Sequence, residues 1–82
     1  MNISGHKIEI KRHAFIRAME RGITPDMIEA TIKSGKIKRF GKNCVKFTKK
    51  YKHFDVICVD EMTGKRIKIV TIERRDYYEE MQ

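Results

Sequence analysis

Three cationic side chains near the start of the chain stand at helical spacing and could act together on an anion. His13, Arg17 and Arg21 follow one another at intervals of four residues in the stretch RHAFIRAMERGIT. Residues four apart are neighbours on a helix surface, and a guanidinium group matches the oxygens of a phosphate. Histidine exchanges protons near neutral pH, so His13 could serve as an acid or a base. The same row also suits the hydrated side of an ordinary helix, and spacing alone leaves both interpretations open.

A second cationic region runs from Ala30 to Phe54, where lysines and arginines are frequent and acidic residues are absent. Aromatic rings are interleaved with the cations, which suits RNA because unstacked bases lie on rings while cations follow the backbone. The alternative is that the lysines protect exposed strand edges from pairing with other chains. The candidate nucleic-acid ligands in this region and in the last strand are Lys38, Arg39, Lys46, Tyr51, His53, Arg66, Lys68 and Arg74.

The net charge supports a polyanionic partner. The chain has 82 residues, enough for one small domain over residues 1–82, and 40% of them are hydrophobic. Nineteen Lys and Arg outnumber eleven Asp and Glu, which gives a net charge of +8. A positive field of this kind attracts polyanions, of which nucleic acid is the commonest. We therefore expect RNA as the partner.

Metal, cofactor and membrane functions find no support in the sequence. Cys44 and Cys58 form no C-x-x-C pair, and no histidine stands at metal-ligand spacing from either. No phosphate-binding glycine loop, nucleophile elbow or carboxylate cluster for Mg²⁺ is evident. We expect neither a metal nor another cofactor. No apolar run approaches a membrane span and the start of the chain lacks the core of a signal peptide, so we expect a cytoplasmic protein.

The elements that must position these side chains can be predicted from periodicity and punctuation. An alternating strand at 6–11 precedes a helix that starts near Arg12 and ends at Gly22. Its expected apolar face comprises Ala14, Phe15, Ala18 and Met19. A second helix has Thr24 as its N-cap and Pro25 in its first position, and stops at Gly35.

Alternating segments at 36–41, 43–49, 53–60 and 66–73 predict the remaining strands. Short polar turns join the last three of these segments into an antiparallel meander. With these three strands counted after the helices, the order β-α-α-β-β-β predicts an α+β fold, in which two N-terminal helices pack on one face of a small antiparallel sheet.

Strand alternation divides the sheet residues between two faces. We expect the helices to cover a face formed by Val45, Phe47, Ile57, Val59, Ile67 and Ile69. The other face would be open, apolar and basic, which is typical of a binding surface, unless a tail or a second copy of the chain covers it. Its expected residues are Cys44, Lys46, Phe54, Val56, Cys58, Arg66, Lys68, Val70 and Ile72.

The helical stretch also resembles a family signature. His13, Ala14, Arg17, Arg21, Gly22 and Ile23 match the pattern H-A-x-x-R-x-x-x-R-G-I, and a TPDMIEA-type helix follows them. Small bacterial and archaeal domains of unknown function open with this pattern, and the resemblance covers residues 6–74. Their layout is similar to that of the RelE-like and BrnT-like toxins of toxin–antitoxin systems.

This resemblance implies helices on an antiparallel sheet, an antitoxin protein as a partner, and cleavage of messenger RNA without a metal. The implied chemistry is attack of a ribose 2′-hydroxyl on the adjacent phosphate, in which cations stabilise the added charge. Lys46, Arg66 and Lys68 would supply that charge, and His13 or Glu73 would act as base or acid, with Arg17 at the rim of the site. The His–Arg row could equally be structural, locking the helix to the sheet.

The leading hypothesis is therefore a toxin-like RNA-binding protein that acts as a metal-independent endoribonuclease, with His13, Arg17, Lys46 and Glu73 as catalytic candidates. One alternative is a nucleic-acid-binding module without catalytic activity. Another is a protein-interaction module whose sheet face pairs with a partner or with itself as a homodimer.

Overall fold

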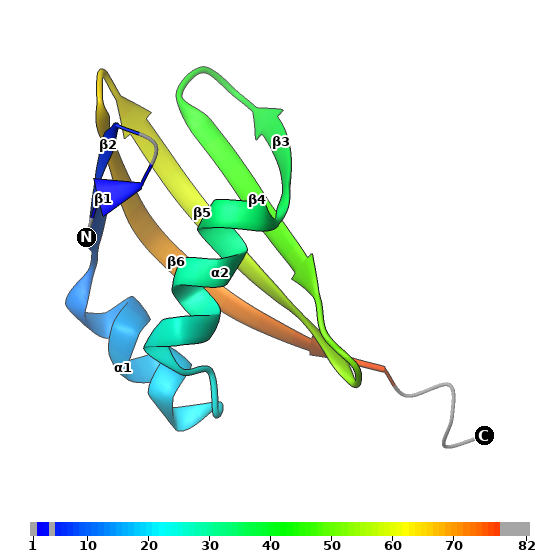
Figure 1. Ribbon diagram of the computed structural model, residues 1–82. Helices are drawn as coiled ribbons and strands as arrows, with labels where there is room; N and C mark the ends of the chain where they lie inside the picture. The colour runs from blue at the N-terminus through cyan, green and yellow to red at the C-terminus, as the bar shows by residue number, and fades with distance from the viewer. Residues whose placement is uncertain (1, 4, 78–82) are drawn as a thin grey trace.

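The computed structural model describes residues 2–3 and 5–77 and shows two helices packed on a six-stranded sheet (Figure 1). The helices are α1 (Arg12–Glu20) and α2 (Pro25–Ser34). The first three strands along the chain are β1 (Asn2–Ile3), β2 (His6–Ile10) and β3 (Lys36–Phe40). The last three are β4 (Cys44–Lys50), β5 (Phe54–Thr63) and β6 (Arg66–Asp76).

The sheet is mostly antiparallel, and its strand order is β1-β2-β6-β5-β4-β3. The one parallel pair joins β2 to β6, with Ile8 opposite Ile67 and Ile10 opposite Ile69. The α+β class, the two-helix layout and a mostly antiparallel sheet are confirmed. The parallel pair was not expected, and the element order is β-β-α-α-β-β-β-β rather than the predicted β-α-α-β-β-β. A strand that is separated from its neighbour by most of the chain gains its direction from tertiary packing, which local sequence signals do not report.

Both helix ends that the sequence marks are formed by the expected interactions. Gly22 has φ of +77°, and the N–H of Ile23 donates to the Ala18 carbonyl at 2.8 Å, as in a Schellman motif. The Thr24 hydroxyl accepts the N–H of Met27 at 3.2 Å and so caps α2. Gly35 follows the end of α2 in an extended conformation, and only glycine fits there, since a Cβ at this position would lie 2.4 Å from the Thr31 carbonyl oxygen.

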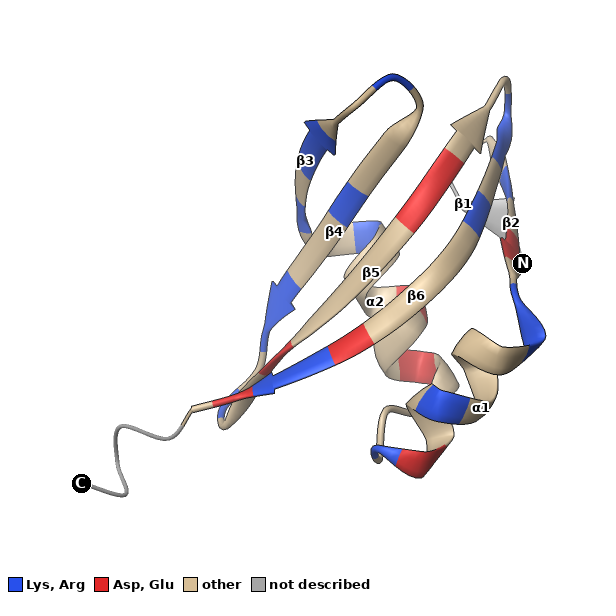
Figure 2. Ribbon diagram, turned by 180° about the vertical axis from the view of Figure 1, so that it is seen from behind, with Lys and Arg blue, Asp and Glu red and all other residues tan. Residues whose placement is uncertain are grey.

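The two helices lie on the same side of the sheet, and Figure 2 shows the other side bare. From α1 only the small residues Ala14 and Ala18 are fully buried, which brings this helix close to β6. Phe15 and Met19, expected on its apolar face, are each 37% exposed. Ile23 and Ile28 are fully buried beneath α2. Neither helix in the described part of the chain is long and apolar enough to cross a membrane.

The two faces of β5 are the reverse of the predicted ones, because the register of the β4–β5 hairpin differs from the register that the predicted faces require. The Tyr51 N–H donates to the Phe54 carbonyl at 2.8 Å, which closes a tight turn over two residues. Phe47 therefore pairs with Cys58. A one-residue change of register moves every side chain of a strand to the other face. Val56 and Cys58 face the helices and Ile57 and Val59 face away, the reverse of the prediction.

A β-bulge in β6 changes the alternation once more. Val59 pairs with Thr71 and Asp60 pairs with Ile69, so Val70 is an additional residue in β6. Ile69 and Ile72 consequently point to the same side, and both are buried in the core under the helices. The prediction that placed Ile72 on the open face is wrong, and the same applies to Phe54, which packs against the core.

The same register places an acidic residue inside the core. Asp60 lies on the helix side of β5, opposite Val45 and Ile69, and is fully buried. Neither carboxylate oxygen has a hydrogen-bond partner among the described residues. Burial raises the pKa of Asp60 from the ordinary 3.8 to about 7. Burial, and secondarily the charge of Asp60, raises the pKa of the neighbouring Cys58 thiol to about 12.

We expect Asp60 to make the protein less stable as the pH rises from about 4 to about 7. In that range the folded state keeps the Asp60 proton while the unfolded state has released it, so unfolding is favoured by rising pH. Asp60→Asn should remove this pH dependence, which should amount to roughly 2–4 kcal/mol of unfolding free energy. Urea unfolding at pH 5 and pH 8 measures it.

Glu61→Gln is the matched control, because Glu61 is the next residue along β5 and is exposed. This variant should keep the pH dependence of the parent. If the parent and Asp60→Asn proteins lose equal stability between pH 5 and pH 8, Asp60 is not the responsible group.

Candidate nucleic-acid interface

The sheet surface that faces away from the helices is here called the open face (Figure 2). Strand pairing places most of the cations of the strands on it. Residues directly opposite one another in neighbouring strands share a face, so the register assigns its members. Lys46 is opposite Lys38 in β3 and Val59 in β5. The cations placed on the open face in this way are Lys7, Lys36, Lys38, Lys46, Lys50, Arg66, Lys68 and Arg75. The acids on it are Glu9, Asp55, Glu61 and Glu73.

The part of the open face that β3 and β4 form combines a cation with an aromatic ring. The Lys46 ammonium lies 6.0 Å from the centroid of the Phe40 ring, which is 41% exposed. Val59, beside Lys46, is half-buried. A partly exposed ring next to an ammonium group offers both a stacking surface and a phosphate ligand.

One end of the open face carries the two other cations that the sequence places there. Arg66 and Lys68 line a shallow hollow of about 430 Å³ together with Glu61 and Thr63. The Arg66 Nε atom lies 3.8 Å from Glu9 Oε2, and both side chains are more than one third exposed. Such an exposed pair is weak, so Arg66 could exchange its carboxylate partner for a phosphate at little cost.

The opposite end of the open face holds a cluster that the sequence reading missed. Lys50, Asp55 and Arg75 are opposite one another in β4, β5 and β6. With Tyr77 they line an open hollow of about 660 Å³, where the Tyr77 hydroxyl donates a hydrogen bond to Asp55 Oδ1. The registers of the β4–β5 and β5–β6 hairpins bring these residues together. No local sequence motif predicts the cluster.

The His13–Arg17–Arg21 row lies elsewhere, in a cleft between α1 and β6. This cleft has a volume of about 230 Å³ and includes Thr71 and Ile72 of β6. Arg21 Nη1 donates a hydrogen bond to the Ile72 carbonyl oxygen at 3.5 Å. The backbone carbonyl of Arg21 accepts a hydrogen bond from Arg74 Nη1 at 2.9 Å. Arg21 thus joins α1 to β6. The side chains of His13 and Arg17 are exposed, and neither forms a hydrogen bond or ion pair with another described residue.

The four catalytic candidates from the sequence do not form one cluster. His13 and Arg17 line the cleft beside β6, whereas Lys46 lies on β4, two strands away. Two strand spacings correspond to about 10 Å. Glu73 is exposed on the open face, opposite Ile57 rather than in the row of Lys46.

The remaining predicted ligands divide between the two sides of the molecule. Lys38 is on the open face, whereas Arg39 points to the helix side, and His53 is exposed in the β4–β5 turn. The Tyr51 hydroxyl donates to the Met27 carbonyl at 3.3 Å and so contacts α2.

Arg74 is held by three contacts on the helix side, which give it a structural role. Its Nε donates to Asp76 at 2.8 Å, its Nη1 donates to Arg21, and its guanidinium carbon lies 4.0 Å from the Phe54 ring centroid. These contacts leave Arg74 poorly placed to reach a ligand on the open face.

Within residues 2–3 and 5–77, no three histidine, cysteine, aspartate or glutamate side chains lie close enough to hold a metal ion together. Comparisons of the chain with protein-family models, with curated proteins and with solved structures found no match.

Proposed function

We propose that the protein binds single-stranded RNA on the open face and cleaves it there without a metal. The observation that carries the binding proposal is the presence of cations from four of the six strands, β2, β6, β4 and β3, on the face that the helices leave bare. Phe40 adds an exposed ring beside Lys46. Cations that follow a backbone and rings that stack bases are the two components of single-strand recognition.

The cleavage proposal is supported by the cluster at the far end of the open face. Around one hollow, Tyr77 supplies a hydroxyl, Lys50 and Arg75 supply two positive charges, and Asp55, which is 6% exposed, supplies a carboxylate. In this proposal Asp55 accepts the proton of the ribose 2′-hydroxyl as that oxygen attacks the adjacent phosphorus. Lys50 and Arg75 stabilise the charge on the phosphorane oxygens, and the Tyr77 hydroxyl gives its proton to the leaving 5′-oxygen. This is the class of activity that the likeness to RelE-like toxins implies.

An antitoxin protein would inhibit such an activity by covering the open face. The alternative is a nucleic-acid-binding module that has no catalytic activity. The two proposals share the binding surface and differ only in the role of the Asp55–Tyr77 cluster, so they are separated by measuring binding and cleavage on the same variants.

We expect Lys46→Ala and Lys68→Ala to weaken binding of a fluorescein-labelled oligouridylate. Each substitution removes one phosphate contact, so it should lower the affinity several-fold and reduce the slope of log affinity against log salt concentration by about 0.7. Fluorescence anisotropy at several salt concentrations measures both quantities. Lys33→Ala on α2 is the control, because this lysine lies on the other side of the sheet, paired with Glu29 at 3.1 Å. Binding that does not depend on salt would contradict the proposed interface.

We expect the protein to cleave RNA in the presence of EDTA, and Arg75→Ala and Tyr77→Phe to slow cleavage about 100-fold with little change in RNA affinity. Gel analysis of an end-labelled RNA measures the rate and shows the 2′,3′-cyclic phosphate ends that this chemistry leaves. Lys33→Ala is again the control, because Lys33 lies on α2, outside this hollow, and pairs with Glu29. Intact binding without cleavage by the parent protein would favour the module without catalytic activity.

A further inference from the structure

The outer edge of β3 is open along its whole length. β3 is the last strand of the sheet, and in the described part of the chain it pairs on one side only, with β4 (Figure 1). All five of its residues are exposed. The backbone N–H and C=O groups along its free edge therefore have the geometry that another strand requires.

The two sides of β3 differ in chemistry. Ile37 is opposite Phe47 and shares its face, so Ile37 and Arg39 point to the helix side. Ile37 is 65% exposed, more than any other large hydrophobic residue in the described part of the chain. Lys36 and Lys38 alternate with them and point to the open face.

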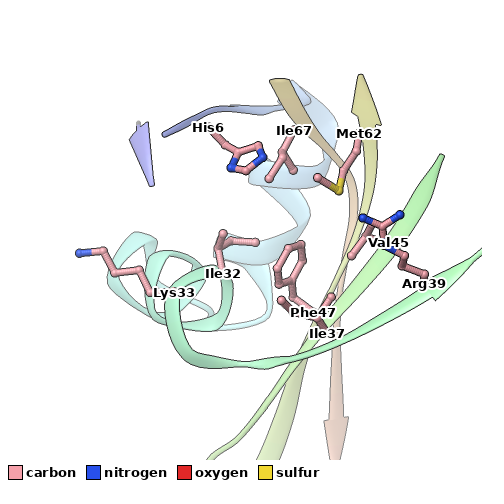
Figure 3. A pocket seen from close by; sticks show the side chains of 9 residues that line it. All are labelled: His6, Ile32, Lys33, Ile37, Arg39, Val45, Phe47, Met62 and Ile67. Carbon is pink, nitrogen blue, oxygen red and sulfur yellow. The ribbon is translucent and has the colours of Figure 1, made fainter. Parts of the chain in front are cut away.

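An apolar cavity lies beside Ile37, between β3 and α2 (Figure 3). Its volume is about 230 Å³. In Figure 3 the side chains of Lys33 and Arg39 lie at opposite sides of this cavity, one on α2 and one on β3. The apolar side chains that line it are Ile32, Ile37, Val45, Phe47, Met62 and Ile67.

A second copy of this chain is a poor occupant for this edge. Two β3 strands placed side by side would bring lysines and an arginine of one copy against those of the other. Like charges directly opposite one another destabilise a strand pair. The charge of the edge instead selects an acidic partner.

We propose that β3 is a docking site for an extended, acidic segment of a partner protein, which adds to the sheet as a seventh strand. Its side chains alternate between the two sides of the enlarged sheet. Those on the helix side are apolar and cover the cavity beside Ile37, and those on the open face are glutamate or aspartate, which pair with Lys36 and Lys38. Main-chain hydrogen bonds supply affinity, and this alternation supplies specificity.

This inference does not rest on RNA binding, because it uses the backbone edge and the cavity on the helix side. RNA could meet the same lysines, but it would neither protect the β3 amides nor depend on Ile37. Strand addition therefore has a signature that RNA binding lacks.

The test uses a capped, labelled octapeptide of alternating valine and glutamate. We expect it to bind the full chain and to slow amide hydrogen exchange at residues 36–40. A peptide with the same residues in two blocks, and one with lysine in place of glutamate, should bind at least about tenfold more weakly. Ile37→Lys should weaken binding by a similar factor, whereas Ile16→Lys, at an apolar residue of α1 that is 45% exposed, should not.

The proposal also predicts a charge reversal. Lys38→Glu should weaken binding of the glutamate peptide and strengthen binding of the lysine peptide. Equal binding of the alternating and block peptides, or binding without amide protection in β3, would overturn the proposal. Oligouridylate binding measured on the same samples reports separately on the open face, so either proposal can fail while the other stands.

Discussion

The hydrogen bond from the Tyr51 N–H to the Phe54 carbonyl, at 2.8 Å, sets the register on which the rest of the structure depends. It fixes the length of the β4–β5 turn and therefore decides which residues of β5 face the helices. With this turn, Val56 and Cys58 fill the core, and Asp55, Ile57 and Val59 lie on the open face. A turn one residue longer or shorter would exchange the two sets.

The core contains one acidic residue whose carboxylate is buried. Asp60 is buried with no partner for its carboxylate among the described residues. It lies on the same side as Cys58 because side chains alternate along β5, and the bulge at Val70 brings Ile69 opposite it. The bulge also turns Ile72 inward, and the outward residues of the last part of β6 are Glu73 and Arg75. The bulge that turns Ile72 inward thus also places Arg75 opposite Asp55 in the candidate site.

Local signals predicted the helices well. The Thr24 cap, Pro25 and the positive φ of Gly22 all depend on residues within a few positions, and each is found as expected. The cations Lys46, Arg66 and Lys68 were also placed on the correct face, because alternation within one strand needs no knowledge of its neighbours. What could not be predicted depends on pairing between strands: the faces of β5, the bulge, the parallel β2–β6 pair and the Asp55–Tyr77 cluster. In α1, periodicity marked Phe15 and Met19 as apolar, but close packing against β6 buries only the two alanines.

The central claim, that RNA occupies the open face, is tested most directly by comparing methyl signals from the two sides of the same strands. Val59 lies on the open face, and Val45 and Ile69 lie on the helix side at neighbouring positions. Titration of the methyl-labelled protein with a short oligouridylate should shift the NMR signals of Val59 and leave those of Val45 and Ile69 nearly unchanged. Larger shifts at Val45 and Ile69 than at Val59, or no shift at any of the three at saturating RNA, would contradict the account.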